Sequence, residues 1–177
     1  MLKEVAPKIV RVGVFSNLDN PTQPLEWREI QSAANGLGLK LQSLGVRRAN
    51  DFDATFRAAL MERSEALINL PEALVNANFK RIVAFAAKHR MPAIYSERSA
   101  IDVNGLMFYG PNGLDLWHRA ATFVDKILKG AKPADLPVEQ PTKFEFIINL
   151  KTAKQIGVMF PQSVLYQADK VIKDAPR

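Results

Sequence analysis

The chain has 177 residues, of which 47% are hydrophobic, and it can therefore bury one sizeable core as one domain or slightly more. Its 24 basic and 18 acidic side chains give a net charge of +6, and the basic residues occur as short pairs without interleaved aromatic residues, which argues against nucleic-acid binding. Cysteine is absent, which excludes disulfides, thiolate metal sites and cysteine nucleophiles, and no apolar run approaches the ~20 residues of a membrane span.

The first half of the chain alternates strands and helices. Residues 8–15 form a nearly continuous apolar run rich in β-branched residues, which predicts a strand buried on both faces of a parallel sheet. Residues 24–37 then repeat apolar side chains at helical spacing, and residues 39–46 alternate as a strand does. Asn50 is a candidate N-cap for a second helix, whose core face runs from Phe52 to Leu60.

The next elements continue the same order. Residues 66–70 predict a third strand, and Pro71-Glu72 opens a third helix with an inward stripe of Val75, Phe79, Ile82, Val83 and Ala86. Strands four and five are expected at 93–95 and 105–109. Short loops between alternating strands and helices imply right-handed crossovers, so we predict an α/β fold with a parallel sheet flanked by helices.

The last third of the chain begins with the most strongly patterned helix, residues 112–129. Its apolar surface is wider than a helix lying on one sheet requires, so we expect it to contact two neighbours. A proline-containing connector at 131–141 is followed by a predicted strand at 143–150 and a helix at 151–156. A final helix is predicted from Pro161, with the inward residues Val164, Leu165, Ala168, Val171 and Ile172.

Polar and aromatic residues follow several of these strands where each strand ends. Because ligands bind at the carboxyl ends of the strands in open α/β sheets, these residues are expected to converge around a small polar or zwitterionic molecule. For each residue alone, ordinary turn and cap chemistry is the alternative, since Asn, Asp and Pro form turns. The candidate ligand-binding residues are Asn17, Asn20, Glu72, Tyr95, Glu97, Tyr109 and Asn112.

Familiar catalytic and cofactor motifs are missing from the sequence. The loop after the first strand has no glycine, which argues against the phosphate-binding turns of nucleotide-binding proteins, and Ser16 lacks the G-x-S-x-G elbow of a nucleophile. His89 lies between two basic residues at a helix end, and His118 has no acidic partner at metal-ligand spacing. We therefore predict no catalytic residue, no metal and no cofactor.

A resemblance to a known family becomes specific in the last third of the chain. Residues 126–157, K-I-L-K-G-A-K-P-A-D-L-P-V-E-Q-P-T-K-F-E-F-I-I-N-L-K-T-A-K-Q-I-G, resemble the tail of the substrate-binding proteins of one bacterial ABC-transporter family, which includes the tryptophan and aromatic amino-acid binding type. The similarity extends to H-R-M-P-A-I-Y at 89–95, to G-L-M-F-Y-G-P-N at 105–112 and to the opening A-P-K-I-V-R-V-G-V, and so covers nearly the whole chain.

This resemblance implies a type I periplasmic-binding-protein fold, with two Rossmann-like lobes that close on a solute such as an amino acid. It also implies a non-catalytic protein that is periplasmic or membrane-associated and that docks on an ABC permease. Family members are longer, with an export signal and a first lobe that have no counterpart before Met1, so we expect this chain to be a piece of such a protein. Residues 1–110 are then the second lobe, and residues 111–177 are returning segments that complete this lobe or pack on the missing one.

Three further expectations follow. Without a first lobe, the chain is expected to bury the apolar face of helix 112–129 by self-association, as a homodimer or by exchange of this helix between copies.

One alternative function is the ligand-sensing domain of a regulator, although residues 1–8 are too short for a DNA-binding segment. The other is a small α/β hydrolase, which would need a nucleophile and a base that the sequence does not supply.

Overall fold

A computed structural model describes residues 1–173, and within them seven strands form one sheet in the order β2-β1-β3-β4-β5-β6-β7. The predicted α/β fold with a mostly parallel sheet is confirmed, because β1 to β5 pair in parallel. The prediction fails at one pairing: β6 runs antiparallel to β5, and β7 then runs parallel to β6. The strands are β1 (Arg11–Asn17), β2 (Lys40–Val46), β3 (Ala66–Asn69), β4 (Ala93–Tyr95), β5 (Met107–Pro111), β6 (Phe144–Asn149) and β7 (Lys170–Ile172).

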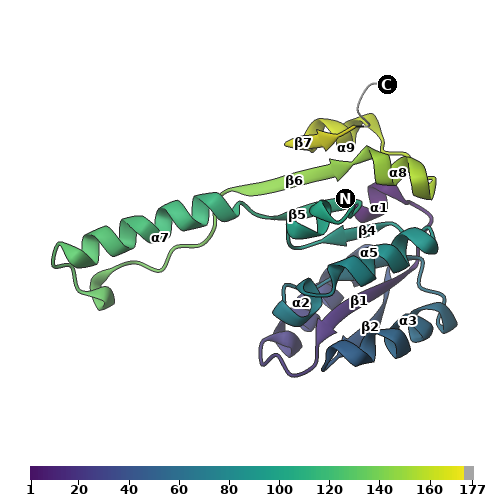
Figure 1. Cartoon of the computed structure of the whole chain (residues 1–177), viewed down its shortest axis with the longest axis horizontal. Coiled ribbons are helices and arrows are strands. Elements are labelled where there is room, and N and C mark those ends of the chain that lie inside the picture. The colour runs from purple at the N-terminus through teal and green to yellow at the C-terminus, as the bar shows by residue number, and fades with distance from the viewer. Residues whose placement is uncertain (174–177) are drawn as a thin grey trace.

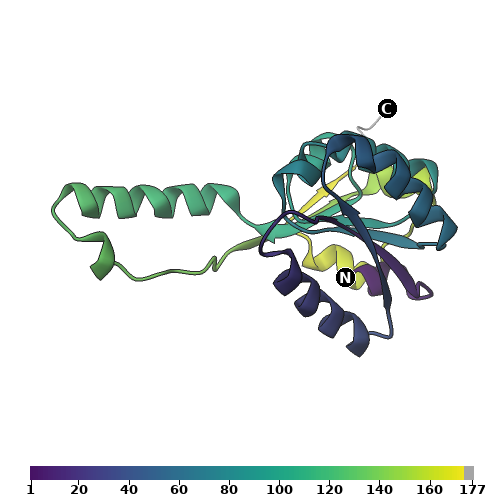
Figure 2. The same cartoon turned by 90° about the horizontal axis from the view of Figure 1, so that it is seen from below.

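Helices cover both faces of this sheet (Figures 1 and 2). On one face, α3 and α5 pack on a core that includes Phe15, Phe52 and Ile82, and on the other α1, α2 and α9 pack on a core that includes Val12 and Ile148. The helices are α1 (Leu2–Val5), α2 (Gln23–Gly36), α3 (Phe52–Met61), α4 (Ala73–Asn76), α5 (Phe79–Lys88), α6 (Ser99–Asp102), α7 (Gly113–Leu128), α8 (Leu150–Ile156) and α9 (Gln162–Gln167), with 3₁₀ turns at Ala49–Asp51 and Pro133–Asp135.

The third predicted helix is the most accurate of the sequence interpretations. All five residues of its predicted inward stripe are buried, although the helix is broken into α4 and α5. Glu72 is the N-cap of α4, because its Oε2 accepts hydrogen bonds from the N–H groups of Leu74 and Val75 at 2.6 and 3.2 Å. A carboxylate at this position satisfies N–H groups that have no partner within the helix.

Other local predictions are wrong. Asn50 does not cap a helix, because it is the middle residue of the 3₁₀ turn Ala49–Asp51. The residue after it, Asp51, accepts hydrogen bonds from the N–H groups of Arg47 and Arg48. The last helix ends at Gln167, and the residues Val171 and Ile172 belong to β7. The short helices α1 and α6 were not predicted, since one turn is too short to show a helical period.

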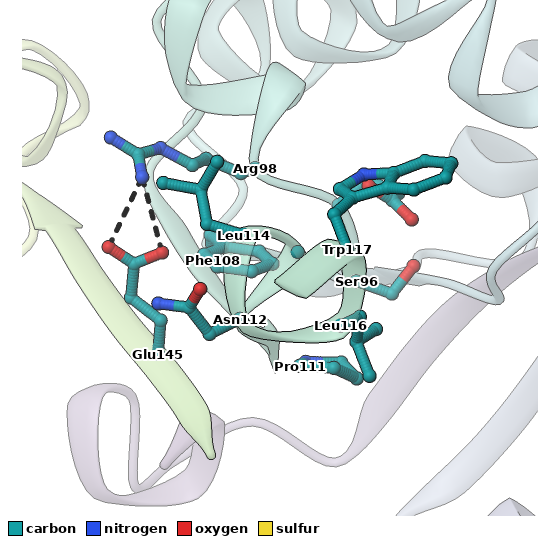
Figure 3. Close-up of a pocket in the computed structure, with 11 residues that line it drawn as sticks. Ser96, Arg98, Phe108, Pro111, Asn112, Leu114, Leu116, Trp117 and Glu145 are labelled. Carbon is teal, nitrogen blue, oxygen red and sulfur yellow. Dashed lines mark hydrogen bonds and ion pairs between the residues drawn. The ribbon is translucent and has the colours of Figure 1, made fainter. Parts of the chain in front are cut away.

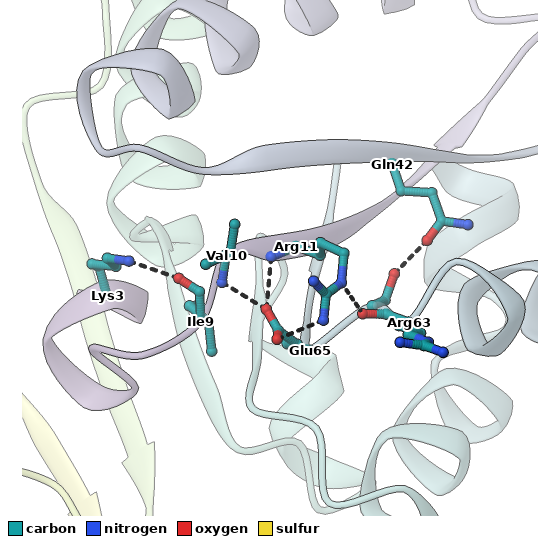
Figure 4. A network of polar contacts seen from close by, with 8 residues as sticks. Lys3, Ile9, Val10, Arg11, Gln42, Arg63 and Glu65 are labelled. Carbon is teal, nitrogen blue, oxygen red and sulfur yellow. Dashed lines mark hydrogen bonds and ion pairs between the residues drawn. The ribbon is translucent and has the colours of Figure 1, made fainter.

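A cluster of polar contacts ties β1 to the start of β3 at the amino ends of the strands (Figure 4). The Glu65 carboxylate accepts hydrogen bonds from the N–H groups of Val10 and Arg11 at 2.6 and 2.8 Å and from Nη2 of Arg11 at 2.7 Å. These contacts hold the pKa of Glu65 below its usual range, with the N–H of Arg11 as the largest cause and that of Val10 next. The cluster lies at the edge opposite the candidate site and serves the fold.

Residues 112–143, here called the arm, extend away from the sheet (Figures 1 and 2). The arm comprises α7 and a returning segment that leads into β6, and none of the α7 side chains is buried in the described structure. Trp117 is 76% exposed and Leu128 is 81% exposed. The wide apolar surface of α7 therefore faces solvent, and nothing in the arrangement of the described residues supports the expected homodimer or the exchange of this helix between copies.

Candidate functional site

The carboxyl ends of β1 to β5 lie at one edge of the sheet, here called the carboxyl edge, because these strands are parallel. The arm leaves the sheet at this same edge, directly after β5 (Figure 1). Asn17, at the end of β1, donates a hydrogen bond from Nδ2 to Oε1 of Glu72 at 3.0 Å. Two predicted site residues that are 55 positions apart are thus in contact, and both are half-buried.

A second contact joins the next two strands along this edge. Asn69, at the end of β3, is 3% exposed, and its Nδ2 donates to Oγ of Ser96 at 2.9 Å. Its Oδ1 accepts from the N–H of Ser96 at 3.1 Å. Both ends of one buried amide therefore hold the loop after β4, which carries Glu97 and Arg98.

This loop borders a hollow of about 410 Å³ at the carboxyl edge (Figure 3). Phe108 of β5 lies against it, and α7 contributes Leu114, Leu116 and Trp117. The remaining residues around the hollow are Ser96, Glu97, Arg98, Pro111, Asn112, Gly113 and Glu145. The hollow thus combines apolar walls with a few charged and amide groups, as small-molecule sites do.

Two of its charged groups form an ion pair across the hollow. The Nη1 of Arg98, from the loop after β4, lies 3.4 Å from both carboxylate oxygens of Glu145 in β6 (Figure 3). The Arg98 side chain is about half exposed, whereas that of Glu145 is largely covered. The pair therefore links the parallel part of the sheet to the strand that returns from the arm.

Asn112 fixes the start of the arm. Its Oδ1 accepts a hydrogen bond from the N–H of Asp115 at 3.0 Å and so caps α7, and its own N–H donates to the carbonyl oxygen of Lys143 at 2.9 Å. The Asp115 carboxylate in turn accepts from Nζ of Lys143 at 2.6 Å, which is the largest cause that lowers its pKa. The two chain segments that join the arm to the sheet are therefore held side by side.

The predicted site residues do not form one group. Asn17 and Glu72 contact each other, and Glu97 and Asn112 border the hollow. Asn20 makes local contacts, since its Oδ1 accepts from the N–H and the hydroxyl of Thr22.

Neither of the two predicted tyrosines borders the hollow. Tyr95 is 2% exposed, and its ring packs edge-on against Phe79 in the core, where burial raises the pKa of its hydroxyl above the usual range. Tyr109 stacks on Phe144 with ring centroids 5.6 Å apart, whereas its neighbour Phe108 borders the hollow. Adjacent residues of a strand point to opposite faces, so the ring of Tyr109 lies away from the hollow.

Several residues around the hollow were not predicted. Phe108 and Glu145 alternate with neighbours that face elsewhere, so strand periodicity could have identified them once the bounds of β5 and β6 were known. Leu114 and Trp117 are part of the apolar surface of helix 112–129, and their proximity to the loop after β4 depends on how the arm leaves the sheet.

Residues 1–173 contain neither a cluster of metal-ligating side chains nor a membrane-spanning helix. In this part of the chain, no group of three or more His, Cys, Asp or Glu side chains lies close enough together to bind a metal ion. None of the helices in that range has the length and hydrophobicity that crossing a membrane would need.

Comparison with solved structures supports the fold. An ABC domain in complex with L-Trp from Streptococcus pneumoniae is 24% identical, with a TM-score of 0.88 over 97% of this chain and 59% of that one. A conserved domain protein from Vibrio cholerae is 22% identical, with a TM-score of 0.88 over 96% of this chain and 57% of that one. A ligand-free, open substrate-binding protein with adhesive properties from Clostridium difficile is 21% identical, with a TM-score of 0.72 over 98% of this chain and 58% of that one.

The chain thus spans less than three fifths of the length of these structures, and at these identities the likeness establishes the fold. A search of curated proteins finds no significant match. The model of the family described as ABC transporter substrate binding protein, however, matches residues 1–172. Because this match covers nearly the entire sequence, the chain belongs to the ABC transporter substrate-binding protein family.

Proposed function

We propose that this chain forms one wall of a solute-binding cleft and that the hollow at the carboxyl edge is part of that cleft. The whole protein would capture a small solute without chemical change and deliver it to an ABC permease, and would do so outside the cytoplasm. The observation that carries this proposal is the position of the hollow. It lies where open α/β sheets bind ligands, and it has apolar walls with charged groups beside them.

The solute class proposed first is an amino acid. One structural neighbour is described in complex with L-Trp, and the hollow of this chain offers an aromatic ring, aliphatic side chains and groups of both charges. Arg98 presents a guanidinium that is only partly engaged with Glu145, since one of its nitrogens makes both contacts. A zwitterion with an apolar side chain would complement these features, since it carries one positive group, one negative group and an apolar body.

The arm is proposed to pack on a second lobe that forms the opposite wall of the cleft. In this proposal residues 1–110 belong to the lobe described here, and the returning strands β6 and β7 complete the same sheet. Two observations support it: α7 exposes its large apolar side chains to solvent, and the structural neighbours are longer than this chain. Burial of apolar side chains is the main driving force for association between lobes.

The experiment is a solute panel followed by NMR with ¹⁵N-labelled protein. Amino acids, carboxylic acids, amines and sugars are added singly up to millimolar concentrations, because a single wall of a cleft binds weakly. Binding that shifts the amide signals of Ser96, Glu97, Asn112 and Gly113 supports the proposal.

A matched variant tests the position of the site. Leu114→Asp places a charge in the apolar wall of the hollow and should weaken binding, whereas Leu128→Asp, near the far end of α7, should leave it unchanged. Shifts confined to other parts of the sheet would reject the hollow as the site. A panel without any binding solute would reject the proposed function for this chain.

A further inference from the structure

The carboxylates near the hollow differ in what they contact. Glu72 accepts hydrogen bonds from Asn17 and from the first turn of α4, and Glu145 pairs with Arg98. Asp115 pairs with Lys143 at 2.6 Å. Each of these acids already has a positively charged or hydrogen-bonding partner within the protein.

Glu97 is the exception among the acids that border the hollow. Its side chain is exposed, and among the described residues its carboxylate makes no hydrogen bond and no ion pair. Its backbone carbonyl accepts from the N–H of Ala100 in the first turn of α6, so the main chain of the residue is held while its side chain is unpaired. Asn69 holds the preceding residue, Ser96, through two hydrogen bonds. The carboxylate is thus carried on an anchored segment.

We propose that Glu97 recognises a primary ammonium group and that it makes the hollow selective for solutes that join such a group to an apolar body. This inference rests on the proposed function, since it assigns the chemical class of solute for the same site. An unpaired carboxylate beside Phe108, Leu114 and Trp117 complements a cation attached to an apolar group. Hydrogen bonds from an ammonium to a carboxylate are among the stronger ones in proteins, because both partners carry charge.

A carboxylate at this position would also make the hollow reject solutes that carry only a negative charge. A solute that has the same apolar body and only a carboxylate would bring a negative charge beside Glu97, and like charges at contact distance repel. Arg98 offsets only part of this penalty, because one nitrogen of its guanidinium already contacts Glu145. The ammonium is therefore the required group, and a carboxylate on the solute is tolerated only when the ammonium is present.

Three probes with the same phenyl body separate these contributions. L-Phenylalanine carries both charges, 2-phenylethylamine carries only the ammonium, and 3-phenylpropanoate carries only the carboxylate. Binding is measured by NMR on the whole chain. We expect the first two probes to bind at least about tenfold more tightly than the third, because they alone can form a charge-assisted hydrogen bond with Glu97.

The variant Glu97→Gln tests the residue. It should weaken binding of the two amines about tenfold and bring their affinity close to that of 3-phenylpropanoate. Asp102→Asn is the matched control, because this exposed acid lies five residues further along and does not border the hollow. It should leave all three affinities unchanged. The Glu97 side chain has no hydrogen bond or ion pair to lose among the described residues, so the folded state of the variant should be as stable as that of the parent chain.

The outcomes distinguish this inference from the function on which it rests. Equal affinity of the parent chain and Glu97→Gln for both amines overturns the inference and leaves the binding function intact. Binding of carboxylic acids or sugars without any binding of amines would likewise overturn the role of Glu97 and leave the binding function intact. Absence of binding by every solute of the wider panel overturns both.

Discussion

Replacing Glu65 by Gln tests how much the polar cluster at the amino ends of the strands contributes to stability. The carboxylate accepts three hydrogen bonds of 2.6 to 2.8 Å, two from the main chain and one from Arg11. A glutamine keeps one acceptor oxygen, but its amide nitrogen cannot accept a hydrogen bond and would face an N–H group of Val10 or Arg11. The variant therefore loses the charge of the acceptor and at least one hydrogen bond.

The expected loss is modest because the cluster is partly exposed. A hydrogen bond to a charged group contributes about 1.5 to 3 kcal/mol in a buried site. The side chains of Glu65 and Arg11 are 33% and 40% exposed, so solvent screens their attraction. We expect Glu65→Gln to lower the free energy of unfolding by about 1 to 2 kcal/mol, which for a chain of this size lowers Tm by about 2 to 8 °C.

The pH dependence gives a second, independent check. The pKa of Glu65 is lower in the folded chain than its ordinary value of 4.5. Its stabilising contribution is therefore fully present above pH 4.5 and disappears as the pH falls through the lowered pKa of the folded state. The difference in Tm between the parent chain and Glu65→Gln should be constant from pH 7 to pH 5 and should shrink below pH 4.5.

Thermal unfolding followed by circular dichroism measures both effects. Glu62→Gln is the matched control, because this exposed carboxylate makes no hydrogen bond or ion pair among the described residues and should change Tm little. Equal Tm values for the parent chain and Glu65→Gln at pH 7 would refute the reasoning. A difference that stays the same down to pH 3 would also refute it, since the effect would then not depend on the charge.

Three other substitutions test the core and the carboxyl edge. Asn69→Ala removes both hydrogen bonds to Ser96 and should cost about 1 to 3 kcal/mol of stability and weaken solute binding in the NMR assay. Gly110→Ala would place a Cβ 2.8 Å from the carbonyl oxygen of Ser96, and should lower stability by about 1 to 3 kcal/mol in chemical denaturation. Ile82→Ala empties a buried core position and should cost about 2 to 5 kcal/mol, measured in the same way.

Two of these substitutions, Gly110→Ala and Ile82→Ala, have a control variant. A Cβ at Gly113, the first residue of α7, would have no atom within 4 Å. If Gly113→Ala lowered stability as much as Gly110→Ala, this would contradict the steric argument. Val138→Ala removes a fully exposed side chain from the arm and should leave stability unchanged, unlike Ile82→Ala. If Asn69→Ala lost stability but bound solutes as the parent chain does, then the loop after β4 would not be required for the site.

The sequence determined the alternation of the first five strands with the longer helices, but not the single-turn helices α1 and α6. Local patterns sufficed there because strands such as β1 are buried on both faces and the third predicted helix has one inward stripe, which is buried from Val75 to Ala86. The Pro71-Glu72 pair also predicts the start of a helix, and Glu72 is the N-cap of α4. These features depend on residues close together in the chain.

Only the tertiary structure decided which side chains surround the hollow. Tyr95 and Tyr109 occupy strand ends as predicted, yet one ring lies in the core and the other stacks on Phe144. A strand end specifies where a residue lies along the sheet but not what its side chain packs against, because adjacent residues of a strand point to opposite faces. The proximity of Arg98 to Glu145 depends on an antiparallel pairing across the arm, and no local pattern in the sequence encodes a contact between residues 47 positions apart.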